Sequence, residues 1–244
     1  MASKESLIRD KSNISLGSWR EKEKLALDLL RIVGELRFDK SVELVIFRRK
    51  IYDARPSEVI NDHQFARNYV SQPISVKNSL ELSRAIAKIE NLAPSKIDLG
   101  KLGVEWAKEG DKFDSIDDFI KNKLTGHIGA EDGNIEPRDV VLYGFGRIGR
   151  LAARCIIEQT GRGEQLRLKA IVVRPKLKDK KEEARKRAAL LRKDTVHGKF
   201  RGIISISDDG SEIVVNGNPI KLIFAKGPEA VSYTHLTLPT TPYV

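Results

Sequence analysis

The chain has little cysteine and no long apolar run, and these two absences exclude several classes of protein. One cysteine in 244 residues cannot form an internal disulfide, which excludes a disulfide-stapled secreted fold and fits a reducing cytosol. No run approaches the roughly 18 apolar residues that a membrane helix needs. The first residues, MASKESLIRDKSNISLGSW, lack the apolar core of a signal peptide. We therefore expect a cytoplasmic protein with no membrane partner.

Histidine is also scarce, at four residues in the whole chain. His63 and His127 have no neighbours at the spacings of metal ligands, so we expect isolated surface histidines. The sequence offers no Ser-His-Asp set for nucleophilic catalysis either. These patterns predict no metal site, and they leave function to other motifs.

Acidic residues are fewer than basic ones, and the formal net charge is +10. Between Arg174 and Lys193 there are ten Lys or Arg against three Asp or Glu, and a basic stripe of this kind can bind nucleic acid. The apolar residues of this segment fall on one side of a helix: Ala184, Ala188, Leu190 and Leu191. The run has no aromatic residue to stack on a base. We therefore favour a helix with one solvated face over a nucleic-acid-binding protein.

Residues 1–137 show mostly helical periodicity. Residues 1–18 lack it and predict a loose terminus, whereas apolar residues recur at spacings of two to four from Trp19 to Leu36. Residues 42–51 are dense in β-branched residues that would suit a strand, but their flanks suit a capped helix equally, and we predict a helix. Four more helices are expected at Ser57–Val70, Val76–Leu92, Pro94–Glu109 and Ser115–Lys123, with Ser57 and Ser95 as N-caps.

A punctuated stretch from Gly126 to Pro137 is the best domain boundary, and from Asp139 strands and helices alternate. Hairpin turns are expected at Asp208-Asp209-Gly210 and Asn216-Gly217-Asn218. The expected strands are 140–143, 166–173, 203–206, 212–215 and 220–224, and the expected helices are 147–160 and a basic helix that ends near Lys193. The order predicts an α/β protein: a helical N-terminal extension over residues 1–137, then the first part of a Rossmann-type nucleotide-binding domain over residues 138–231.

The candidate site is a turn spelled G-x-G-x-x-G, which follows the apolar strand from Val140 to Tyr143. Gly144 allows the tight turn, Gly146 lets the backbone approach a pyrophosphate, and Gly149 lets helix and strand pack closely. The pyrophosphate would sit on the free N–H groups and the positive dipole end of the next helix. A strand before the turn and a helix after it are the context that the fingerprint requires. The sequence therefore predicts a dinucleotide-binding site.

Three segments in order resemble the glyceraldehyde-3-phosphate dehydrogenase family: GFGRIGR (Gly144–Arg150), DTVHGKF (Asp194–Phe200) and VNGNPI (Val215–Ile220). The resemblance covers roughly residues 140–229, and the helical extension resembles, less specifically, a longer bacterial-type variant. It implies an NAD- or NADP-dependent oxidation of glyceraldehyde 3-phosphate to an acyl phosphate, in glycolysis or gluconeogenesis, by a homotetramer.

The resemblance also implies which residues contact the cofactor. The family's contacts to the pyrophosphate and adenosine fall on Phe145, Gly146, Arg147 and Ile148. At the end of the second strand the family has an Asp that binds the adenosine ribose hydroxyls, and this sequence has Arg174 there. Because an Arg can pair bidentately with a 2′-phosphate, we expect the protein to accept NADP as well as NAD. The alternative is that Arg174 points to solvent and NAD remains the cofactor.

The family's catalytic segment, Ser-Cys-Thr-Thr-Asn, does not occur in this sequence. Cys155 lies on the helix after the glycine turn, beside Ile156 and Ile157, and we expect a buried structural thiol there. His197 belongs to the DTVHGKF motif, where we expect it to tie the loop together. We therefore expect this chain to be a fragment that binds a dinucleotide but does not turn over substrate, with no catalytic residue of its own.

Residues 232–244 form a tail without a single Lys, Arg, Asp or Glu, although 32 % of the chain is charged. The sequence SYTHLTLPT within it resembles translated sequencing adapter, and the alternative is a natural Thr- and Pro-rich tail. We expect this tail to pack on nothing. A second hypothesis for the chain is a non-catalytic dinucleotide-binding or sensing module whose helical extension binds a partner.

Overall fold

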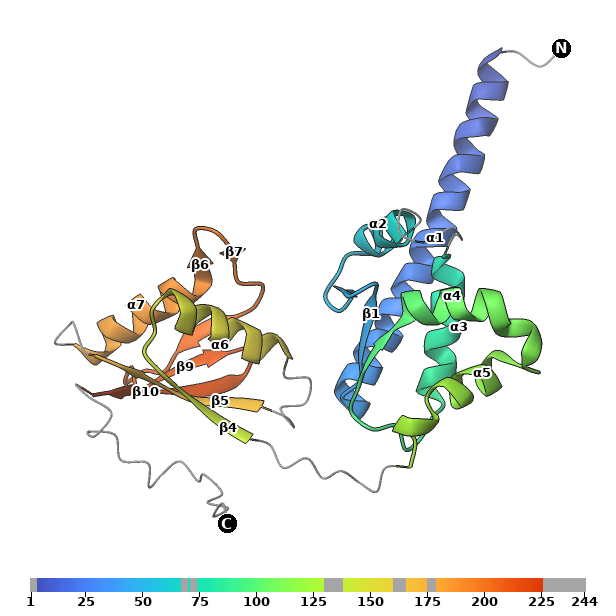
Figure 1. Ribbon diagram of the computed structural model, residues 1–244. Coiled ribbons are helices and arrows are strands. Elements are labelled where there is room, and N and C mark those ends of the chain that lie inside the picture. Colours follow the sequence, from blue (N-terminus) through green and yellow to red (C-terminus); the bar gives the residue numbers. More distant parts are fainter. Residues whose placement is uncertain are drawn as a thin grey trace. The chain divides into compact units, whose positions relative to one another are not determined.

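The computed structural model describes residues 4–66, 70, 74–129, 138–159, 166–174 and 179–225. Its contacts divide the chain into two compact units, unit 1 (Met1–Asn134) and unit 2 (Ile135–Val244), each with its own hydrophobic core (Figure 1). The tail at residues 232–244 lies outside the described residues. None of the helices in the described part of the chain combines the length and the apolar character needed to span a bilayer.

The described residues of unit 1 form helices around a small sheet of order β2-β1-β3, in which β2 is antiparallel and β3 parallel to β1. The helices are α1 (Lys4–Lys40), α2 (Pro56–Ala66), α3 (Val76–Ala87), α4 (Leu99–Glu109) and α5 (Ile116–Lys123), and short 3₁₀ turns lie at Gly110–Lys112 and Thr125–His127. The strands are β1 (Glu43–Ile46), β2 (Arg49–Lys50) and β3 (Lys96–Asp98).

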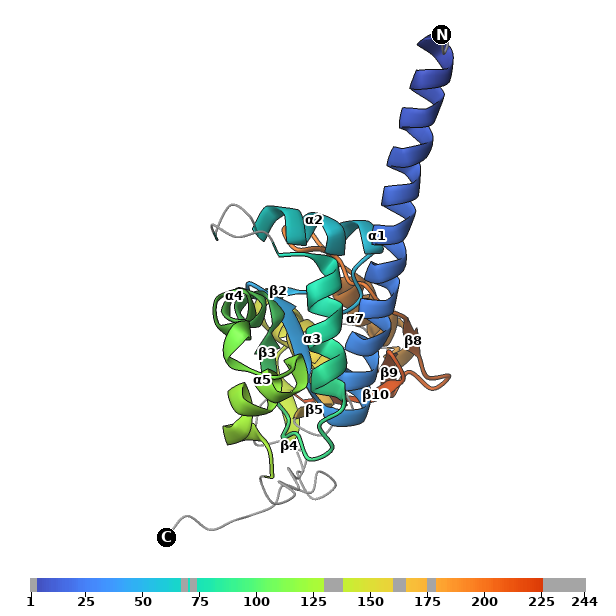
Figure 2. The same cartoon turned by 90° about the vertical axis from the view of Figure 1, so that its right-hand side faces the viewer.

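Helix α1 begins at Lys4, so the loose terminus expected for residues 1–18 is wrong over its described part. From Lys11 onward, where the side chains are described, the core residues of α1 lie in its second half: Ala26, Leu29, Ile32, Val33 and Leu36. The first half projects past the other helices of unit 1, and α3 lies along the second half (Figures 1 and 2). Because helix propagation is far easier than nucleation, the packed half extends into a segment that has no proline to stop it.

The helix expected over residues 42–51 is wrong, because this segment forms the β1–β2 hairpin. Phe47 and Arg48 make its two-residue turn with φ angles of 45° and 68°. The Asp98 carboxylate accepts hydrogen bonds from both turn residues, from Phe47 N (2.8 Å) and Arg48 N (3.1 Å). Asp98, whose carboxylate stabilises this turn, lies about 50 residues further along the chain. The residues that flank 42–51 therefore give no sign that the segment forms a hairpin.

Asp98 also corrects the expected start of the next helix. Its carboxylate caps α4 by accepting from Gly100 N and Lys101 N, so the helix begins after Asp98 and not at the expected N-cap Ser95. The cap is also the last residue of strand β3 (Lys96–Asp98), which pairs with β1. Ser57 is not a cap either, since α2 begins at Pro56 and the Glu58 carboxylate accepts from Arg55 N.

His63 is buried, at 3 % exposure, so the expectation of a surface histidine is wrong for this residue. It lies on α2 and bonds to Val59 O through Nδ1 (2.7 Å) and to Ser79 Oγ on α3 through Nε2 (2.9 Å). Since a carbonyl only accepts, Nδ1 carries the proton and Nε2 accepts from the Ser79 hydroxyl. Burial lowers the pKa of His63, against smaller opposing effects of the Val59 carbonyl and Asp62. His127 is exposed, as expected.

Unit 2 is the expected α/β fold, with a five-stranded sheet of order β4-β5-β10-β9-β8 in its described residues. Strands β4, β5 and β10 are parallel, and β8, β9 and β10 follow one another as antiparallel hairpins. The elements are β4 (Arg138–Tyr143), α6 (Arg147–Gln159), β5 (Leu166–Val173), α7 (Lys180–Arg192), β6 (Lys193–Asp194), β7 (Gly198–Lys199), β8 (Ile204–Ile206), β9 (Glu212–Val215) and β10 (Asn218–Phe224).

Helices α6 and α7 share one apolar core with the sheet (Figure 1). Ala153 and Ile157 on α6, and Ala184, Ala188 and Leu191 on α7, meet side chains of β5, β9 and β10. The basic helix α7 therefore turns its narrow apolar side to the sheet, as expected. Most of its Lys and Arg side chains are exposed.

Candidate dinucleotide-binding site

The glycine turn lies where the parallel strand β4 ends, and two of its glycines are required by the geometry. Gly144 has a φ of +92° and donates from its N–H to Val172 O of β5 (2.8 Å). A Cβ on Gly149 would lie well inside van der Waals distance of the Gly144 carbonyl oxygen. Gly144 thus supplies a conformation that other residues rarely adopt, and Gly149 lets helix α6 close onto the turn.

The start of α6 presents main-chain donors on an open surface. The first helical hydrogen bond joins Arg150 N to Gly146 O (3.0 Å), so the N–H groups of Arg147, Ile148 and Gly149 precede the helical ladder. A Cβ on Gly146 would meet nothing within 4 Å, and Gly146, Arg147 and Ile148 are exposed. Free N–H groups at the positive end of a helix dipole suit a phosphate group.

The four residues that the resemblance assigns to the cofactor differ in what they can offer. Phe145 is 4 % exposed and its ring belongs to the core of unit 2, so only its main chain is available to a ligand. Ile148 is 78 % exposed and offers its side chain. Arg147 and Gly146 lie at the surface beside it.

The structure brings the DTVHGKF motif next to the glycine turn. Arg147 donates from Nη2 to Thr195 Oγ1 (3.2 Å), and Arg150 pairs through Nη2 with Asp194 Oδ2 (3.4 Å). These residues lie more than 40 positions apart in the sequence. Two of the three segments that carry the family resemblance, GFGRIGR and DTVHGKF, are therefore neighbours in space.

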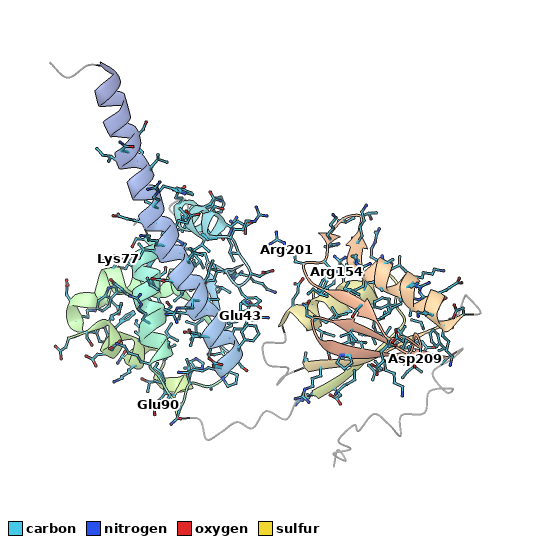
Figure 3. All side chains as sticks on the ribbon, turned by 180° about the vertical axis from the view of Figure 1, so that it is seen from behind. Glu43, Lys77, Glu90, Arg154, Arg201 and Asp209 are labelled. Carbon is cyan, nitrogen blue, oxygen red and sulfur yellow. The ribbon has the colours of Figure 1, made fainter. Side chains whose placement is uncertain are left out.

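Arg154 is a third arginine that joins α6 to the segment around the DTVHGKF motif. The sequence analysis did not predict a role for it. It donates from Nε and Nη2 to Leu191 O and from Nη1 to Gly198 O (Figure 3). Arg147, Arg150 and Arg154 are spaced three and four residues apart, so they share one face of α6. That spacing was a visible signal, but nothing in the sequence showed what the face would meet.

Asp194 is the centre of the β6–β7 hairpin and is 5 % exposed. Its Oδ1 accepts from His197 N (3.0 Å) and Val196 N (3.0 Å) and lies 3.2 Å from His197 Nδ1. These contacts, the His197 N–H above all, hold the pKa of Asp194 well below its usual range. His197 thus helps to tie the loop together, as expected.

Arg174 follows the last residue of β5 and is exposed. Because β4 and β5 are parallel neighbours, it lies at the same carboxyl edge of the sheet as Gly144, the edge at which α/β sheets bind ligands. Its main-chain carbonyl accepts from Arg187 Nη2 of α7 (3.4 Å). The structure therefore presents an exposed guanidinium one strand away from the glycine turn.

Cys155 is exposed, so the expected buried thiol is wrong. The buried positions of α6 are Ala153, Arg154 and Ile157, and a residue about half a turn from this stripe faces solvent. Among the described residues, no group of three or more His, Cys, Asp or Glu side chains could hold a metal ion.

The sequence of this chain is similar to known proteins of one family. Residues 138–240 match the model of the glyceraldehyde 3-phosphate dehydrogenase NAD binding domain, and this match extends into the tail at residues 232–244. The glyceraldehyde-3-phosphate dehydrogenase of Neurospora crassa is 35 % identical over 95 residues, which are 39 % of this chain and 25 % of that protein. That of Lactococcus lactis is 35 % identical over 94 residues, or 38 % and 24 %.

A third relative also covers unit 1. The glyceraldehyde-3-phosphate dehydrogenase-like protein of Pseudomonas aeruginosa is 38 % identical over 209 residues, 84 % of this chain and 44 % of that protein. The alignment is longer than residues 138–244 can supply, so it includes much of unit 1. The chain spans less than half the length of these relatives. With the glycine turn in place and this NAD binding domain matched, the chain belongs to the glyceraldehyde-3-phosphate dehydrogenase family.

Proposed function

We propose that this chain supplies the dinucleotide-binding site of a phosphorylating glyceraldehyde-3-phosphate dehydrogenase. Such an enzyme oxidises an aldehyde to an acyl phosphate. The observation that carries the proposal is the geometry of the glycine turn. At Gly149 there is no room for a Cβ beside the Gly144 carbonyl, whereas the space beside Gly146 at the start of α6 is open. The pyrophosphate binds the main-chain N–H groups of Arg147, Ile148 and Gly149. Phe145 contributes through its main chain, and Ile148 through its exposed side chain.

The adenosine end of the dinucleotide then reaches the end of β5, where Arg174 stands. A guanidinium forms charge-assisted hydrogen bonds with a 2′-phosphate, whereas it offers no acceptor to the ribose hydroxyls. We propose that Arg174 lets the protein bind NADP in addition to NAD. Its exposure at the carboxyl edge supports this assignment.

The remaining proposals concern the whole enzyme. Its substrate is glyceraldehyde 3-phosphate, which the names of the relatives support, and its setting is the cytoplasm, which the single cysteine supports. Its assembly is a homotetramer, as the resemblance to the family implies. We further propose residues 1–137 as a helical extension, residues 138–231 as the dinucleotide-binding portion, and residues 232–244 as a tail.

The proposed dinucleotide-binding site is tested by measuring the binding of NAD and NADP to the full chain by calorimetry. Gly146→Ala adds a methyl group into open space, so the fold should keep its thermal stability while the affinity for both dinucleotides falls at least about tenfold. Gly34→Ala adds the same methyl group on α1, also with nothing within 4 Å, and serves as the matched control. Unchanged affinity in Gly146→Ala would contradict the proposed site.

Arg174→Asp tests the cofactor assignment separately. An Asp repels a 2′-phosphate and accepts from a 2′-hydroxyl, so the ratio of NADP affinity to NAD affinity should fall by a factor of roughly 10 to 100. A ratio that stays the same would leave NAD as the only supported cofactor. Lys221→Asp, an exposed cation on β10, controls for the loss of charge.

A further inference from the structure

A buried ion pair lies on α7 beneath the exposed basic face of that helix. Glu183 is 1 % exposed and Arg187 is 8 % exposed, and they bond one helical turn apart, Arg187 Nη2 to Glu183 Oε1. Their neighbours Glu182, Arg185 and Lys186 are exposed. The pair is therefore distinct from the solvated charges of α7.

Stability alone explains this pair poorly. Burying two charges costs about as much as their attraction returns, and a well-packed apolar pair of similar volume is often as stable or more so. Arg187 also keeps its Nε buried without a hydrogen-bond partner among the described residues. An unpaired buried donor adds a further cost.

The pair has one contact that an apolar pair could not make: Arg187 donates a hydrogen bond to the main chain of Arg174. The last bond of the described sheet at this edge joins Ala225 N to Val173 O (3.1 Å). The next carbonyl along the chain belongs to Arg174, and it accepts from Arg187 Nη2 (3.4 Å). Because Glu183 holds the same Nη2, the guanidinium has a defined place from which it reaches the carbonyl.

We infer that Glu183 and Arg187 are positioning residues that fix the direction of Arg174 and thereby set the preference of the site for a 2′-phosphate. The inference rests on the proposed role of Arg174. A recognition side chain must be held by supporting contacts to keep its geometry, and here the main-chain end of Arg174 is held by α7. The pair itself does not touch the cofactor.

The test removes both charges together, since Arg187→Met alone would change the net charge inside the core as well as the contact to Arg174. In the double variant Glu183→Leu/Arg187→Met of the full chain, the affinity for NADP relative to NAD should fall about fivefold, within the range of coupling seen between residues of one network. The NAD affinity and the melting temperature should hold or rise. Glu182→Leu/Arg185→Met makes the same change of charge on the exposed face of the same helix and should leave the ratio unchanged.

A double-mutant cycle separates positioning from a general structural effect. In an Arg174→Ala background, the Glu183→Leu/Arg187→Met change should have no further effect on the ratio. An equal loss of affinity for both dinucleotides, or a ratio that stays at the wild-type value while Arg174→Ala lowers it, would overturn the inference and leave the role of Arg174 intact. A wild-type ratio that does not respond to Arg174→Ala would overturn both.

Discussion

The part of the chain before Arg138 and the part from Arg138 onward differ in charge as sharply as the two units differ in fold. Residues 1–137 contain 23 Lys and Arg and 23 Asp and Glu, whereas residues 138–244 contain 21 and 11. The net charge of +10 thus belongs entirely to the part of the chain that matches the NAD binding domain. A positive field around that part raises the local concentration of a phosphate-bearing ligand, so the total charge needs no nucleic-acid partner to explain it.

The units also build their tight turns in different ways. In unit 2 the described residues with positive φ are glycines, such as Gly144 and Gly217, and Asn216, a residue type that tolerates this region. In unit 1 the hairpin turn has Phe47 and Arg48 in that region, and the Asp98 carboxylate holds both N–H groups. A left-handed conformation costs an ordinary residue roughly 1–2 kcal/mol, so unit 1 depends on a distant side chain for what unit 2 obtains from the residue type.

The largest loss of stability is expected at Gly149, where unit 2 has the least room for a side chain. Gly149→Ala places a methyl group against the Gly144 carbonyl, which is backbone and cannot rotate away. We expect unit 2 to lose about 2–3 kcal/mol of stability, and dinucleotide binding with it. Chemical unfolding followed by hydrogen exchange on β4 and α6 measures this, with Gly34→Ala as the control. Unit 1 should not respond, and a loss of stability there would contradict the independence of the two cores.

The matching experiment in unit 1 is Asp98→Ala. It removes the acceptor of four N–H groups, two in the hairpin turn and two at the start of α4. Loss of the helix cap alone costs about 1 kcal/mol, and we expect about 2 kcal/mol in total for unit 1. Glu90→Ala, at an exposed carboxylate of the same unit (Figure 3), should cost almost nothing. Equal effects of the two changes would show that Asp98 does not hold the turn.

Acid should weaken unit 1 through His63. Burial lowers its folded-state pKa below the ordinary value of 6.5, so its neutral form is fully stabilising above pH 6.5. As the pH falls below 6.5 the unfolded chain takes up the proton first, and stability is lost progressively. Thermal unfolding of His63→Gln should show a smaller drop between pH 7 and pH 5 than the wild type. His127→Gln, at an exposed histidine, should keep the wild-type slope.

The smallest effect is a gain. Arg48→Gly removes the side chain that makes a φ of 68° unfavourable and keeps the N–H that bonds to Asp98. We expect unit 1 to gain about 0.5–1 kcal/mol, less the extra flexibility of glycine in the unfolded chain. The change in denaturation midpoint measures this. A loss of stability would mean that the exposed Arg48 side chain makes a contact worth more than the strain.

The same contrast explains which features the sequence could predict. The strands, helices and hairpin turns of unit 2 follow from signals within a few residues, such as Asn216-Gly217, and most bounds agree to within two residues. The β1–β2 hairpin needed Asp98, about 50 positions away, and a buried His63 needed Ser79 on another helix. At the site, the roles of Gly144 and Gly149 could be predicted from the motif itself. The burial of the Phe145 ring could not, because the core that covers it is assembled only by the tertiary structure.

Helix α1 has a consequence for the dynamics of unit 1. At 37 residues and about 1.5 Å of rise per residue, it is much longer than the core that its second half packs against. The segment from Lys11 to Lys24 has mostly exposed side chains, so its backbone hydrogen bonds persist only through continuity with Ala26–Leu36. Amide protection should therefore decline steadily toward the N-terminus. Opening of the packed half would release the whole projecting segment at once.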